Sequence, residues 1–133
     1  MANAVLPAPP GPLATIVEPV RCFDQDSVAA IIATLEASPP GWPPGWALET
    51  LGTLRTVSPS AVMWTFEAVC RGALLTLEQC LAAELALTRH VTRHPDFAEG
   101  VRAMVVDKDR NPRWSPPRLE DVSADDIAAM FER

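Results

Sequence analysis

Apolar residues recur at helical spacing along most of the chain. The clearest ridge is Leu77, Leu81 and Leu85, which Cys80, Leu87 and Val91 widen. Side chains three or four residues apart lie on one side of a helix. No segment alternates apolar and polar residues as a strand convincingly would, so the sequence predicts an all-α fold of five or six helices with proline-rich loops. The predicted helices span 26–37, 46–54, 58–71, 76–93 and 96–105, and the last begins near Ser123.

Candidate capping residues stand at the starts of four of these segments. Ser, Thr and Asp side chains accept hydrogen bonds from the free backbone N–H groups of a first helical turn. A Gln three residues after the cap completes a capping box, and proline is favoured at the first helical position. The candidates are Asp26 or Ser27, Ser58 before Pro59, Thr76 with Gln79, and Ser123 with Asp126.

The segment 58–71 is apolar on more than one side. One stripe comprises Val62, Met63, Phe66, Val69 and Cys70. Trp64 and Ala68 extend the apolar character to the opposite side. A helix that is apolar on most sides needs neighbours on most sides. This pattern predicts that the chain packs against more protein than it contains.

Prolines are concentrated in the first part of the chain. Because proline fixes φ and lacks an N–H group, the run between Ala8 and Pro12 is incompatible with a helix or a central strand. We therefore expect residues 1–25 to be a proline-rich, extended lead-in and residues 26–133 to be the helical domain. The sequence of 38–45, Ser-Pro-Pro-Gly-Trp-Pro-Pro-Gly, predicts a rigid loop. In one interpretation the tryptophans of this loop pack back on the domain. In the other, the Trp-Pro-Pro-Gly-Trp segment acts as a proline-rich ligand for an aromatic groove of a partner. We favour the first interpretation.

Charge excludes two classes of partner. The net charge is -6 and the sequence pI is about 4.8. Neutralising phosphates requires a surplus of Lys and Arg, so neither nucleic acid nor an anionic membrane is an expected partner. No apolar run approaches the roughly 20 residues of a membrane helix. Since the first residues carry no basic charge, no targeting peptide is expected, and we predict a cytoplasmic protein.

The cysteines and histidines give no strong sign of a reactive or metal site. Cys22, Cys70 and Cys80 lack the close pairing of a zinc site, and we expect reduced, partly buried thiols. His90 and His94 stand four residues apart and could share a helix face. Without a third ligand in register, solvent-facing or capping histidines are the favoured interpretation, and no metal is predicted.

The acidic clusters are the remaining candidates for catalysis. One comprises Asp107 and Asp109, flanked by Lys108 and Arg110; the other lies at 120–126. A catalytic carboxylate pair usually needs an apolar environment that raises a pKa, and nothing apolar surrounds these groups in the sequence. Interleaved opposite charges are typical of a solvated surface. On residues alone, no catalytic residue is predicted.

The segment from His94 to Trp114, followed by Pro117, resembles the C-terminal signature of 3-hydroxyisobutyryl-CoA hydrolases of the crotonase superfamily. In that signature a phenylalanine, Glu-Gly-Val-Arg-Ala, Asp-Lys-Asp and Pro-x-Trp occur in this order, as they do here. The resemblance extends over Val20 to Arg133. It also includes Ser58-Pro59-Ser60, Thr76-Leu77, and Arg21-Cys22-Phe23 ahead of Asp26-Ser27-Val28.

The resemblance implies a fold and a function. Enzymes of this superfamily bind acyl-CoA in a spiral of ββα units, polarise the thioester carbonyl with two backbone N–H groups, and end in helices. This chain resembles those helices without the spiral, so no catalytic residue is carried over. The resemblance implies that the chain is the C-terminal part of an acyl-CoA thioester hydrolase of valine catabolism. By itself this part would not be catalytic. The alternative is a non-catalytic subunit that assembles with a separate crotonase core.

By the same resemblance, the helices would cover the acyl-CoA site or contact a neighbouring subunit. Lys108 and Arg110 are candidates to pair with a CoA phosphate, and Trp114 to stack on adenine. The opposing interpretation, which we favour, anchors Trp114 in the domain and leaves the charges solvated. Acyl-CoA would be the substrate of the complete enzyme, and no cofactor is implied. A crotonase-fold core is the expected partner, and exposed apolar faces also predict self-association.

Overall fold

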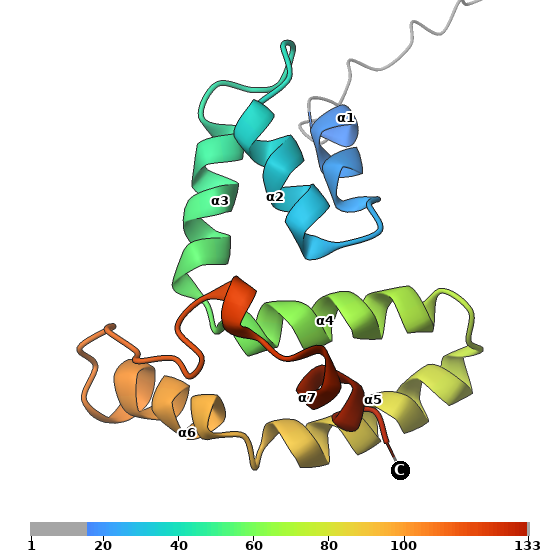
Figure 1. Cartoon of the computed structure of the whole chain (residues 1–133), viewed down its shortest axis with the longest axis vertical. Helices are drawn as coiled ribbons and strands as arrows, with labels where there is room; N and C mark the ends of the chain where they lie inside the picture. Colours follow the sequence, from blue (N-terminus) through green and yellow to red (C-terminus); the bar gives the residue numbers. More distant parts are fainter. Residues whose placement is uncertain (1–15, 133) are drawn as a thin grey trace, which may run out of the picture. The chain divides into compact units, whose positions relative to one another are not determined.

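The computed structural model describes residues 16–132, and these residues form helices and turns without any strand. The all-α prediction is confirmed (Figure 1). The α-helices are α1 (Val17–Val20), α2 (Val28–Ala37), α3 (Trp46–Thr56), α4 (Pro59–Gly72), α5 (Leu77–Val91), α6 (Pro95–Val101) and α7 (Ala124–Ala129). Two 3₁₀ turns, η2 (Arg21–Phe23) and η4 (Leu119–Asp121), and a π-helical turn, η3 (Arg102–Val106), complete the described chain.

The proline run between Ala8 and Pro12 lies outside the described residues, so the predicted extended conformation is not tested there. The described end of the lead-in carries α1 and η2, which the sequence pattern did not predict. The described residues form two compact units, 16–52 and 53–132, whose boundary falls within α3.

The four predicted capping sites are confirmed. In each case the side-chain oxygen accepts a hydrogen bond from the backbone N–H three residues later. The donors are Ala30 to Ser27, Ala61 to Ser58, Gln79 to Thr76 and Asp126 to Ser123. Gln79 also accepts from the Thr76 N–H, which closes the capping box. These helices therefore begin where local sequence predicts.

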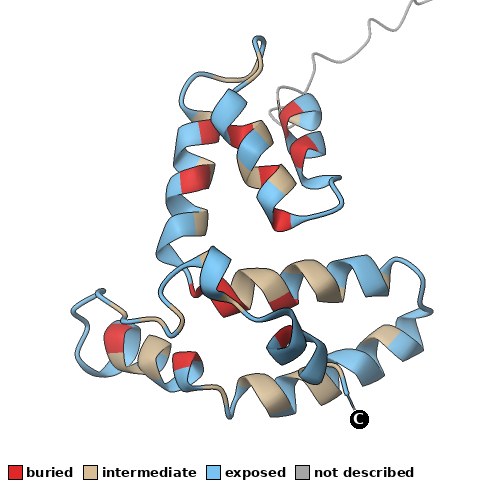
Figure 2. Ribbon diagram, in the orientation of Figure 1, coloured by how far each residue is buried: buried red, intermediate tan, exposed pale blue. Residues whose placement is uncertain are grey.

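The first unit is built around α2. Its inward side is buried at Val28, Ile31 and Leu35 (Figure 2). The loop between α2 and α3 turns at Gly41 and Gly45, whose φ angles of 97° and 80° suit glycine. The two tryptophans of this region, Trp42 and Trp46, pack edge to face with ring centroids 5.2 Å apart, and Phe23 packs against Trp46. Packing of these tryptophans within the unit, the favoured interpretation, is confirmed.

The second unit contains α4 to α7. α4 contacts both η4 and α7, and α6 continues directly into η3 (Figure 1). The buried residues of this unit come from several of these elements: Ser58, Pro59, Ser60, Trp64, Asp96, Ala103 and Ile127. On α4 the buried aromatic is Trp64, whereas Val69, at the far end of the predicted stripe, is 69% exposed.

The helix α5 differs from the others because it has no buried residue. The ridge Leu77, Leu81 and Leu85 is exposed, while Cys80, Leu87 and Val91 are half-buried. The helix therefore turns Cys80, Leu87 and Val91 inward and leaves Leu77, Leu81 and Leu85 on the surface. Figure 2 shows that α5 is exposed along much of its length.

Candidate functional site

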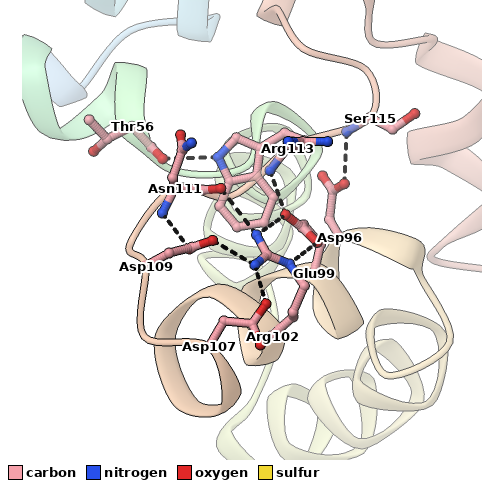
Figure 3. Close-up of polar contacts among 10 residues, drawn as sticks. Thr56, Asp96, Glu99, Arg102, Asp107, Asp109, Asn111, Arg113 and Ser115 are labelled. Atoms are coloured by element: carbon pink, nitrogen blue, oxygen red, sulfur yellow. Dashed lines mark hydrogen bonds and ion pairs between the residues drawn. The ribbon is translucent and has the colours of Figure 1, made fainter.

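The segment that carries the sequence signature folds around one arginine. Arg102, at the junction of α6 and η3, uses all five N–H groups of its guanidinium (Figure 3). Two bind both oxygens of Glu99, at 2.9 and 2.8 Å. The others bind Asp107 and Asp109, each at 2.7 Å, and the carbonyl oxygen of Asn111 at 3.1 Å.

The π-helical turn brings these partners together. The N–H of Asp107 bonds to the carbonyl of Arg102, five residues back, at 2.8 Å. The N–H of Arg110 then bonds to the carbonyl of Ala103, a fully buried residue. The chain thus returns beside its own helix, and the two acidic side chains of the loop face Arg102. Since its donors are occupied, Arg102 holds the loop and has none left for a ligand.

The electrostatics of this cluster favour the charged forms. The Arg102 side chain, and then the Arg113 backbone N–H, lower the pKa of Glu99 to about 2. Hydrogen bonds from Arg102 and from the Asn111 backbone also lower the pKa of Asp109, and the carboxylates raise the pKa of Arg102. A general acid needs a raised pKa instead. These groups are therefore unsuited to proton transfer near neutral pH.

A buried aspartate connects three separate parts of the second unit. Asp96 is 4% exposed, accepts a hydrogen bond from the Ser58 hydroxyl at 2.5 Å, and accepts another from the Ser115 N–H at 2.8 Å. The start of α4, the start of α6 and the loop after Trp114 thus meet at one carboxylate. Figure 3 shows the bond between Asp96 and Ser115. Sequence reasoning missed this contact, because Ser58 and Asp96 are 38 residues apart and nothing local signals the pairing.

His94 is a capping residue, as one of the favoured interpretations predicted. Its Nδ1 accepts a hydrogen bond from the Asp96 N–H at 3.2 Å, and its ring packs edge to face on Trp64. Among residues 16–132, no three His, Cys, Asp or Glu side chains are grouped so as to hold a metal ion. Cys22 is buried, which raises the pKa of its thiol.

The three residues proposed from the sequence to contact CoA lie in or beside the loop that Arg102 holds. Trp114 is half-buried, and its indole N–H donates to the carbonyl of Thr56 at 2.9 Å. A Cβ at Gly100 would lie 3.4 Å from the edge of the Trp114 ring, so the helix approaches the ring closely. These contacts favour the anchoring role.

Lys108 and Arg110 are both exposed, and both adopt left-handed backbone conformations, with φ of 56° and 54°. Non-glycine residues adopt this region rarely. Neither side chain forms a hydrogen bond or ion pair with another residue of 16–132. Within the sequence Asp-Lys-Asp-Arg at 107–110, the two acidic residues bind Arg102. The two basic residues between and after them remain available to bind a ligand.

Beside this cluster lies a hollow of about 390 Å³, lined by Glu99, Arg102, Asp109, Asn111 and Arg113. No buried side-chain nitrogen or oxygen in the described part of the chain lacks a hydrogen-bond partner. In this hollow the Glu99, Arg102 and Asp109 side chains are already bonded to one another or to the backbone. Separately, no helix of the described residues has the length and apolarity needed to cross a membrane.

Comparison with known proteins extends this local picture. Residues 6–131 match the family model described as enoyl-CoA hydratase/isomerase. The chain is 41% identical over 113 residues to the mitochondrial 3-hydroxyisobutyryl-CoA hydrolase of Dictyostelium discoideum. It is 39% identical over 116 residues to the probable 3-hydroxyisobutyryl-CoA hydrolase 2 of Arabidopsis thaliana. The matches cover 84% and 85% of this chain but only 29% and 31% of those proteins.

Among solved structures, the chain resembles a carnitinyl-CoA dehydratase from Mycobacterium thermoresistibile with a TM-score of 0.81 and 35% identity. The match covers 96% of this chain and 36% of that one. The chain thus spans about a third of the length of the relatives that it matches.

Proposed function

Because the chain belongs to the enoyl-CoA hydratase/isomerase family, we propose that it supplies the C-terminal helical part of a 3-hydroxyisobutyryl-CoA hydrolase. The complete enzyme would cleave an acyl-CoA thioester in valine catabolism. The observation that carries the proposal is the match of 84% of this chain to the Dictyostelium hydrolase, of which it spans 29%. Substrate and reaction are inferred from that relative.

The chain is not catalytic alone in this proposal. Thioester hydrolysis requires donors placed for the developing oxyanion and a group that activates water. Within residues 16–132, the clustered carboxylates are engaged: Glu99, Asp107 and Asp109 bind Arg102, and both oxygens of Asp96 accept hydrogen bonds. The missing chemistry would come from the part of the family's fold that this chain does not span, here called the catalytic portion. It is the proposed partner, whether joined to this chain or separate.

Lys108 and Arg110 are the proposed CoA contacts. Both are exposed cations on a loop fixed by Arg102, and in this proposal they would pair with phosphate oxygens without further ordering of the backbone. Holding non-glycine residues in the left-handed region costs free energy, which the rest of the fold must offset. In this proposal Trp114 anchors the loop, and the exposed part of its ring would stack on the adenine of CoA.

The compartment remains a prediction. The sequence predicts the cytoplasm, whereas the similar hydrolases of Dictyostelium discoideum and Xenopus tropicalis are named as mitochondrial proteins. Microscopy of a tagged chain, with a mitochondrial marker, decides between the two.

A chimera tests the proposal. In it, this chain replaces the matching 113-residue segment of the Dictyostelium hydrolase. We expect the chimera to hydrolyse 3-hydroxyisobutyryl-CoA, the parent lacking that segment to be inactive, and the pure chain to be inactive. Turnover by the pure chain would contradict the proposal. So would a folded chimera, with a cooperative thermal transition, that has no activity.

A further inference from the structure

The helix α5 carries an apolar surface that nothing in the described chain covers. We infer that the leucine stripe, defined as Leu74, Leu77, Leu81 and Leu85, is the surface on which the catalytic portion packs. The inference rests on the proposed function and identifies the surface by which that partner is held. The partner's matching surface would be apolar at its centre and free of unpaired charge.

The stripe is strongly exposed. Leu74, in the turn before α5, is 89% exposed, and Leu77, Leu81 and Leu85 are 77%, 58% and 59% exposed. The three helical leucines are four residues apart, so their side chains form one row along the helix. Scattered surface leucines are ordinary, but a contiguous row of large aliphatic side chains marks an interaction surface.

The rest of α5 supports a helix built for a partner. No residue of the helix is buried, and its half-buried apolar residues lie on a different side from the stripe: Cys80, Ala86, Leu87 and Val91. Its start is fixed by the Thr76 and Gln79 capping box. Propensity alone gives a helix of this length marginal stability, and most helical stability comes from packing of an apolar side. The helix therefore has a well-defined start, but its apolar leucines are not buried within the described chain.

The occupant follows from the length of chain that relatives carry. This chain matches a segment that makes up 36% of the solved Mycobacterium enzyme, with a TM-score of 0.81. The remaining part of such an enzyme is thus available to cover an apolar surface that this chain leaves exposed. Charged residues flank the stripe, among them Glu78, Glu84 and Arg89, in the manner of a polar rim around an apolar interface.

The test compares one double substitution in two settings. Leu77→Gln with Leu81→Gln is made in the isolated chain and in the chimera with the Dictyostelium hydrolase. The matched control is Leu48→Gln with Val17→Gln, because these helical residues are 73% and 58% exposed and lie outside both the leucine stripe and the apolar stripe of 58–71. In the isolated chain the stripe variant should move the thermal midpoint by no more than about 3 °C, as surface substitutions do. In the chimera it should lower the midpoint by about 5 °C or more, since the same side chains would be buried there.

Each other outcome overturns the inference in a distinct way. Small shifts in both settings would mean that the stripe is not the interface, while an active chimera would leave the proposed function standing. Large and equal shifts in both settings would mean that the stripe belongs to the chain's own packing. If the isolated chain is a dimer that the stripe variant dissociates, while the chimera is unaffected, the occupant is a second copy. A chimera that fails to fold with the native stripe removes the proposed function and this inference together.

Discussion

Removal of the buried Asp96 carboxylate should destabilise the second unit more than removal of any exposed acidic group. Asp96→Ala leaves the Ser58 hydroxyl and the Ser115 N–H without their acceptor in a site where the residue is only 4% exposed. A hydrogen bond to a carboxylate contributes about 1.5–3 kcal/mol, and a buried donor left unpaired is costly. We expect the free energy of unfolding to fall by about 3–5 kcal/mol, from urea titrations followed by circular dichroism.

Two milder variants test whether the loss follows hydrogen bonding. Asp96→Asn keeps an oxygen for the Ser115 N–H, and the Ser58 hydroxyl can rotate to accept from the new amide, so the cost should be about 1–2 kcal/mol. Ser58→Ala removes one bond to Asp96 and the cap of α4 as well, at about 2–3 kcal/mol. Because the two residues share a hydrogen bond, the double variant should cost less than the sum of the single variants.

The exposed Glu120 provides the control, since Glu120→Ala should change stability by about 0.5 kcal/mol or less. A cost of Asp96→Ala no greater than that of this control would contradict a structural role for the buried carboxylate. Strict additivity of Ser58→Ala and Asp96→Ala would mean that the two side chains do not interact.

Three further predictions concern the loop held by Arg102. The pKa of Glu99 is lowered from 4.5 to about 2. Its contribution to the stability of the folded state is therefore fully present above the unfolded value of about 4.5 and is lost as pH falls through about 2. A titration of the Glu99 carboxyl group by NMR with a midpoint at or above 4 would refute this prediction. Lys108→Ala with Arg110→Ala in the chimera should raise KM for the acyl-CoA about tenfold with kcat unchanged, whereas Arg118→Ala, a cation already paired on the same unit, should leave both constants alone. Trp114→Phe keeps an aromatic ring but removes the N–H donor to a backbone carbonyl, so thermal denaturation should show a loss of about 1 kcal/mol, and an unchanged midpoint would argue against the anchoring role.

Local features of the fold were predictable from the sequence. Helix starts depend on a few adjacent residues, so the caps at Ser27, Ser58, Thr76 and Ser123 were found correctly. Helical periodicity identified the apolar residues of α5 as one widened ridge, but it did not show that Cys80, Leu87 and Val91 pack inward while Leu77, Leu81 and Leu85 stay exposed. The apolar segment 58–71 led us to expect that the chain packs against additional protein. The exposed leucine stripe of α5 is consistent with that expectation.

Contacts between distant residues were not predictable in the same way. The alternating charges around Asp107 and Asp109 indicated a solvated surface, yet the structure joins them to Arg102. That cluster depends on the π-helical turn at 102–106, which no local pattern announces. The link between Ser58 and Asp96 is set by tertiary packing alone. For the candidate site, the sequence located the basic pair Lys108 and Arg110 but not the network that positions it.

The central claim is that these helices act only together with a catalytic portion. The most direct measurement is a thioesterase assay with 3-hydroxyisobutyryl-CoA in which this chain is co-purified with the Dictyostelium hydrolase lacking its matching segment. We predict no turnover by either chain alone, and turnover by the pair that saturates at a fixed molar ratio. Hydrolysis by the pure chain, or a complex of the two soluble chains that remains inactive, would contradict the account.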